Sequence, residues 1–143
     1  MKIQKQTARS SLAWVLLLSV LYSIIGEVIF QIFYYHDSLL NYYEWWVILL
    51  SVAYTSPIVL LFRNQFWYFS VFILFFYLIF SIIFMFIFGE VFPIIDDNPA
   101  GGILGIMIQG INIISFSLGT ILGLLINLSI QYWMKLNNQG NLG

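Results

Sequence analysis

The chain has 143 residues, of which 62% are hydrophobic and 8% are charged, and its formal net charge is −1. Soluble domains carry roughly 25% charged residues, so this composition is typical of a membrane protein. The absence of cysteine excludes disulfides, thiol catalysis and thiolate metal sites, and the absence of a basic patch excludes a nucleic-acid partner.

The first apolar stretch runs from about residue 12 to residue 35. The segment before it is basic and contains Lys2, Lys5 and Arg9. A basic start and an apolar run are also typical of a signal peptide. This run, however, exceeds the usual length of about 7–15 residues and lacks a clean cleavage site between small residues. We therefore predict that the stretch is an uncleaved membrane-spanning helix.

A polar stripe runs along one face of this first predicted helix, because every fourth position is polar or small. Its members are Ser19, Ser23, Glu27 and Gln31. Glu27 is the only ionisable residue inside any predicted span, and a charge at the bilayer centre costs at least about 2.5–3.5 kcal/mol. Two interpretations follow. Glu27 either binds a proton or cation, or is a neutral carboxyl group that hydrogen-bonds its neighbours and fixes their packing.

The second and third spans are predicted at about residues 44–62 and 66–88. Residues 36–44 form a short loop rich in Tyr, and Tyr and Trp mark the boundary between membrane and water. Residues 66–88 contain no charge, no proline and no glycine. They exceed the roughly 20 apolar residues that are needed to cross a hydrocarbon core of about 30 Å. Their aromatic side chains predict a helix on the lipid side of the protein.

The fourth predicted span, at about residues 102–134, carries a second stripe of small and polar residues at helical periodicity. Its members are Gly105, Gln109, Asn112, Ser115, Gly119, Gly123, Asn127 and Gln131. Small residues let another helix approach closely, and amides hydrogen-bond across the contact. The stripe therefore predicts either packing, within the chain or against another subunit, or a pore lined by Gln109, Asn112 and Asn127.

The charges predict how the spans are arranged. With four spans, one side of the membrane receives Lys2, Lys5, Arg9, Arg63 and Lys135, and the other receives His36, Asp37, Glu44, Glu90, Asp96 and Asp97. Basic loops remain cytoplasmic. We predict an all-α integral membrane protein in which residues 1–143 form a single transmembrane domain, an antiparallel four-helix bundle with both termini cytoplasmic. Its first and fourth helices would supply the polar interior, and the protein would be multi-pass in the plasma (inner) membrane.

Two functions compete on this basis. The first hypothesis is a non-enzymatic accessory, assembly or immunity-type subunit that works through helix–helix contacts with another membrane protein or a second copy of itself. The alternative is a small oligomeric transporter or channel, coupled to a proton or cation through Glu27. With one histidine and no cysteine, we expect no catalytic residues, no metal site and no cofactor. The lipid bilayer is an expected partner in either case.

Overall fold

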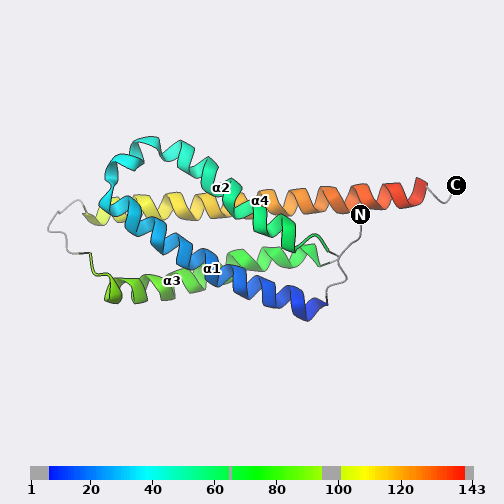
Figure 1. Cartoon of the computed structure of the whole chain (residues 1–143), viewed down its shortest axis with the longest axis horizontal. Coiled ribbons are helices and arrows are strands. Elements are labelled where there is room, and N and C mark those ends of the chain that lie inside the picture. The colour runs from blue at the N-terminus through cyan, green and yellow to red at the C-terminus, as the bar shows by residue number, and fades with distance from the viewer. Residues whose placement is uncertain (1–6, 65, 95–100, 141–143) are drawn as a thin grey trace.

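A computed structural model describes residues 7–64, 66–94 and 101–140. Within these residues, four helices are long and apolar enough to cross a membrane. They are α1 (Ala8–Tyr35), α2 (Tyr43–Leu61), α3 (Val71–Val91) and α4 (Gly101–Gly140). Together they carry the chain four times along the long axis of the molecule (Figure 1). The prediction of an all-helical protein with four candidate membrane spans is confirmed.

The helices begin at positions that differ from the predicted ones. The first helix starts at Ala8 and not at residue 12, because the Thr7 hydroxyl caps it by accepting a hydrogen bond from the Ser10 N–H at 3.3 Å. The predicted loop before α2 is instead largely a 3-10 helix, η1 (Asp37–Tyr42). Another 3-10 turn, η2 (Trp67–Ser70), precedes α3.

The fourth helix is longer than predicted, because it continues to Gly140 and does not end near residue 134. Its 40 residues correspond to about 60 Å at about 1.5 Å per residue. A hydrocarbon core of about 30 Å cannot contain that length. The C-terminal part of α4 accordingly extends past the other three helices (Figure 1).

The closest helix pairs are α1 with α3 and α2 with α4. In the first pair, the Ser19 hydroxyl donates to the Ile73 carbonyl at 3.3 Å, and the Ser23 hydroxyl donates to the Tyr77 carbonyl at 3.2 Å. A step of four residues on α1 thus matches a step of four on α3, so the two helices run in the same direction. The buried residues of α3 are Ile73, Tyr77 and Ser81, whereas most of this helix is exposed on the outside of the bundle.

The second pair repeats this arrangement. The Ser51 hydroxyl donates to the Ser115 carbonyl at 3.1 Å, and the Thr55 hydroxyl donates to the Gly119 carbonyl at 3.0 Å. The α2 and α4 helices therefore also run in the same direction. In both pairs the bridging hydroxyls come from the earlier helix. Each has a single hydrogen, which it shares with a carbonyl four residues back in its own helix, and that carbonyl is the nearer of the two acceptors.

Four aromatic rings, one from each helix, meet at the centre of the bundle. Phe116 lies with its ring centroid 3.9 Å from that of Tyr77, 5.4 Å from that of Tyr54 and 5.5 Å from that of Tyr22. The Tyr22 hydroxyl also donates to the Tyr54 carbonyl at 2.9 Å. We call these four residues the aromatic cluster. It joins the two helix pairs, and all four side chains are buried.

Candidate functional site

Glu27 lies on α1, one to two turns beyond the aromatic cluster, and its side chain is only 3% exposed. The carboxyl group hydrogen-bonds the side chain of Gln109 on α4 and interacts electrostatically with Tyr77 on α3. Its Oε1 atom has no hydrogen-bond partner among the described residues. The carboxyl group is therefore enclosed by three helices, in the part of the bundle where the sequence predicts a membrane.

Gly26, directly before Glu27, leaves room for Asn112 to approach α1. A Cβ atom at Gly26 would collide with Asn112 Nδ2 and would lie 3.4 Å from the Tyr77 hydroxyl. Asn112 and Tyr77 thus approach α1 at the one position where it has no side chain. The Tyr54 hydroxyl donates to Asn112 Oδ1 at 2.9 Å, so α2 also contributes to holding this site.

Ser81 and Gln109 complete the site on the side away from the aromatic cluster. Gln109 Nε2 donates to the Ser81 hydroxyl at 3.4 Å, and Ser81 lies beside the hydroxyl of Tyr77. We call the following six residues the Glu27 cluster: Gly26, Glu27, Tyr77, Ser81, Gln109 and Asn112. Three helices supply its members, and their positions in the sequence span 87 residues from Gly26 to Asn112.

Four buried polar atoms of the Glu27 cluster have no hydrogen-bond partner within the described part of the chain. They are Glu27 Oε1, the Tyr77 hydroxyl, Gln109 Oε1 and Asn112 Nδ2. More than about nine in ten buried polar groups in proteins are paired, with protein or with ordered water. This concentration around one carboxyl group is the reason to treat the cluster as the candidate functional site.

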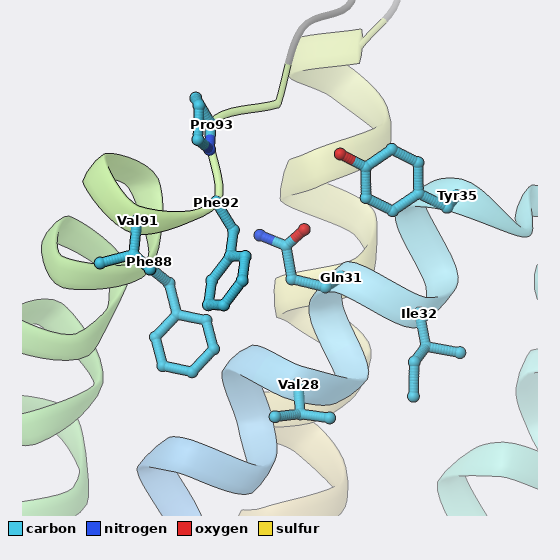
Figure 2. Close-up of a pocket in the computed structure, with 8 residues that line it drawn as sticks. All are labelled: Val28, Gln31, Ile32, Tyr35, Phe88, Val91, Phe92 and Pro93. Carbon is cyan, nitrogen blue, oxygen red and sulfur yellow. The ribbon is translucent and has the colours of Figure 1, made fainter.

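A cavity of about 540 Å³ opens next to the cluster, between α1 and the end of α3. Its lining consists of Val28, Gln31, Ile32, Tyr35, Phe88, Val91, Phe92 and Pro93. Figure 2 shows the Gln31 amide in this space, with Phe88 and Phe92 on one side and Tyr35 on the other. Val28 follows Glu27 directly, and Gln31 lies one turn beyond it on the same helix. The cavity therefore begins within one turn of Glu27 along α1, although Glu27 itself does not line it.

The other predicted residues of α1 lie outside this site. Ser19 and Ser23 donate to carbonyls of α3, and both hydroxyls are therefore used in helix packing. Gln31 is half-buried at the cavity. The stripe on α1 is thus divided: Ser19 and Ser23 pack against α3, and Glu27 alone belongs to the candidate site.

The stripe on α4 is divided in a similar way. Gln109 and Asn112 face α1 and α3, whereas the small residues Ser115, Gly119 and Gly123 lie against α2. Asn127 Nδ2 donates to the Ile58 carbonyl at 3.2 Å and so also belongs to the contact with α2. Asn127 is 15 residues from Asn112, or about 22 Å along the helix at 1.5 Å per residue. The structure therefore brings Gln109 and Asn112 together with Glu27 but leaves Asn127 apart.

Three residues of this region are absent from the sequence-based predictions: Tyr54, Tyr77 and Ser81. Tyrosine in a membrane protein usually marks the interface with water. Tyr54 and Tyr77, however, occur in the middle of apolar runs, and a buried tyrosine hydroxyl normally requires a hydrogen-bond partner. That position within the span is the signal that identifies them.

The side chains of the Glu27 cluster are polar groups that are able to bind a ligand. It offers one carboxyl group, one phenol, one hydroxyl and two carboxamides, which together can hold a proton, a cation or a small polar molecule. Comparisons with protein-family models, curated proteins and solved structures find no match to this chain.

Proposed function

We propose that this chain is a small non-enzymatic membrane transporter or channel that binds and releases a proton or cation at Glu27. The supporting observation is the set of four unpartnered polar atoms around a carboxyl group that is 3% exposed. Burial of an unpaired polar group costs roughly 1–3 kcal/mol, and a charged group costs more. A site with several such groups is more stable when a bound proton or cation satisfies them than when it is empty. A binding cycle requires this difference in free energy between the occupied and the empty state.

In the membrane, the proposed arrangement is an antiparallel bundle of consecutive helices with both termini cytoplasmic, in the plasma (inner) membrane. The start of α1 and the end of α4 lie toward the same end of the molecule (Figure 1). Arg9, Arg63 and Lys135 lie toward this end, whereas Glu44 and Glu90 lie toward the other. Asp37, at the start of η1, also lies toward the end that carries Glu44. The other charged residues that support this topology, Lys2, Lys5, Asp96 and Asp97, are outside the described residues.

This orientation makes the cavity beside Gln31 open toward the outer side of the membrane. The aromatic cluster lies on the other side of Glu27, where it would close the proposed path toward the cytoplasm. In this proposal, Glu27 exchanges its proton or cation with the outer side by way of this cavity. Release to the inside would require the α1–α3 pair to shift against the α2–α4 pair, at the contacts that the aromatic cluster makes between them.

Substitution of Glu27 by glutamine tests this function. Glutamine keeps the size and the hydrogen-bonding capacity of the side chain but cannot exchange a proton or carry a charge. In proteoliposomes loaded with a pH-sensitive dye, we expect the wild-type protein to dissipate an imposed proton or cation gradient and Glu27→Gln to lose that activity at least tenfold.

The matched control is Glu44→Gln, which makes the same chemical change at an exposed position on α2. This variant is expected to retain the wild-type rate. Equal rates for wild-type protein, Glu27→Gln and empty liposomes would refute the proposal, provided that both variants melt in detergent at temperatures close to that of the wild-type protein.

A second candidate function is the accessory, assembly or immunity-type subunit, and a face of α3 favours it. Five exposed apolar residues follow one another along α3 in alternating steps of three and four: Phe72, Phe75, Ile79, Ile82 and Phe86. That spacing is typical of a seam that packs against another helix. A partner that co-purifies in mild detergent with the wild-type protein, and is lost from Phe75→Ala, would favour this function.

The proposed topology leads to a separate prediction. The chain contains no cysteine, so single cysteines can be introduced and labelled without background. In intact cells, an impermeant thiol reagent is expected to label Asn41→Cys in η1 and not Leu136→Cys at the end of α4, which requires permeabilised cells. Both positions are exposed. The reverse pattern would contradict the cytoplasmic location of the termini.

A further inference from the structure

We propose that the cavity between α1 and the end of α3 binds one zwitterionic phospholipid from the leaflet that surrounds this end of the bundle. One acyl chain of the lipid lies in the cavity, and an ester carbonyl of the same lipid accepts a hydrogen bond from the Gln31 amide. The ligand and the space are both separate from the Glu27 cluster, because Glu27 does not line this cavity of about 540 Å³.

The walls of the cavity are apolar and open to the surroundings of the bundle. Phe88 and Phe92 of α3 form one side, and Ile32 of α1 lies on the other (Figure 2). Ile32 and Phe92 are also exposed on the outside of the bundle. In a membrane these surroundings are lipid acyl chains, so a chain reaches the cavity from the side. The volume lies within the range of about 300–1,000 Å³ that is typical of ligand sites.

Gln31 shows that the occupant carries a polar group as well as an apolar one. Its amide projects into the cavity between Phe92 and Tyr35 (Figure 2). Within the described part of the chain, the half-buried Gln31 amide takes part in no side-chain hydrogen bond. An amide among apolar side chains is costly unless it is hydrogen-bonded. A hydrocarbon chain alone would leave that cost in place, whereas a chain with an attached carbonyl removes it.

The depth of Gln31 matches the ester groups of a phospholipid. Tyr35 is exposed at the end of α1, where tyrosine marks the boundary between membrane and water. Gln31 lies four residues before Tyr35, which is about 6 Å nearer to the bilayer centre at about 1.5 Å per residue. The headgroup region is about 5–8 Å thick on each side of the hydrocarbon core. Gln31 Nε2 can therefore donate to ester carbonyls, which lie where the headgroups meet the acyl chains.

The charges near the cavity select against an anionic headgroup. Glu90 is exposed and directly precedes Val91 of the cavity wall. The Arg and Lys residues that the structure describes lie toward the opposite end of the bundle. The His36 ring, beside Tyr35, lies 3.2 Å from the Ile32 carbonyl through its Nδ1 atom. A headgroup that carries an ammonium group beside its phosphate is therefore favoured over one with a net negative charge.

An occupied cavity would close the outer path to Glu27. The cavity begins within one turn of Glu27 along α1, and the proposed function uses it for exchange with the outer side. A bound acyl chain would exclude water from this path, so exchange would require the chain to leave. This consequence rests on the proposed function, whereas the lipid site itself does not.

Native mass spectrometry of the purified protein tests the site. Protein in mild detergent is mixed with equal amounts of phosphatidylethanolamine and phosphatidylglycerol that carry the same acyl chains. We expect one retained lipid per protein, with phosphatidylethanolamine favoured at least threefold. Gln31→Leu removes the amide and Val28→Phe fills part of the cavity, so each should reduce this retention at least threefold. The matched control is Val52→Phe, the same change at an exposed position on α2 outside this cavity, and it should retain the lipid as the wild-type protein does.

Equal retention by the wild-type protein, Gln31→Leu and Val28→Phe would overturn the proposal, because the lipid would then lie elsewhere on the surface. Equal retention of the two lipids by the wild-type protein would overturn it as well. A phosphatidylethanolamine with a photoreactive group on its acyl chain makes the test independent of any variant. We expect it to label residues 88–93 of α3, and labelling spread over all four helices would contradict the site.

The lipid site and the transport function fail separately, because lipid retention is measured without any gradient. A retained lipid without gradient-dissipating activity contradicts the transport function alone. Activity of a wild-type protein that retains no lipid contradicts only the lipid site.

Discussion

Substitution of Phe116 by alanine is expected to lower the free energy of unfolding by about 3 kcal/mol, toward the lower end of the roughly 3–5 kcal/mol seen for buried Phe→Ala changes. Phe116 is 0% exposed and contacts an aromatic ring from each of the other three helices. In a membrane the gain from leaving water is absent on assembly of the helices, so lost packing contacts and the remaining cavity determine the cost. The loss should also loosen the contact between the two helix pairs.

The control for Phe116 is Phe86→Ala on α3, where the phenylalanine is 67% exposed. Removal of a ring that already faces the surroundings of the bundle leaves no cavity, so the expected change is within about 0.5 kcal/mol. Unfolding in mixed micelles with increasing denaturing detergent measures both variants. A loss for Phe86→Ala as large as that for Phe116→Ala would show that the aromatic cluster is not the centre of the fold.

Substitution of Gly119 by alanine is expected to destabilise the protein by about 1–3 kcal/mol, as overpacking of a close contact typically does. The added Cβ would lie 2.8 Å from the Ser51 carbonyl oxygen and 2.8 Å from Tyr54 Cβ. Because one of these atoms belongs to the backbone of α2, the two helices must separate to accept the methyl group. Their separation would also weaken the hydrogen bond from Thr55 to the Gly119 carbonyl.

Gly110→Ala is the matched control for Gly119, because it makes the same change on the same helix. A Cβ atom at Gly110 meets nothing within 4 Å. Alanine is favoured over glycine inside a helix by roughly 0.5–1 kcal/mol, so this variant should be as stable as the wild-type protein or more so. The two substitutions are therefore expected to have opposite signs in detergent melting. Equal effects would contradict the assignment of Gly119 to the contact between α2 and α4.

The sequence predicts the candidate spans and many of their buried faces. Apolar runs of about 20 residues identify membrane-spanning helices because every backbone polar group must be satisfied within the helix itself. Helical periodicity then identifies the polar faces, and Ser19, Glu27, Asn112 and Asn127 are indeed buried. Both features depend only on residues close to one another along the chain.

Which helices meet was decided only by the tertiary structure. Ser19 and Ser51 hydrogen-bond backbone carbonyls of α3 and α4, and every helix offers such carbonyls, so their sequence does not specify the partner. The same holds for Gly119, which permits a close approach but does not identify the helix that approaches.

The environment of Glu27 also depended on that pairing. The first helix predicts a buried carboxyl group, but its neighbours Tyr77 and Gln109 are 50 and 82 residues away along the chain. They meet Glu27 because α1 packs on α3 while α4 crosses nearby, and because Gly26 leaves room for Asn112. The sequence alone determined that a carboxyl group lies within a candidate membrane span. The tertiary structure decided which unpartnered donor and acceptors surround it, since those depend on contacts between distant segments.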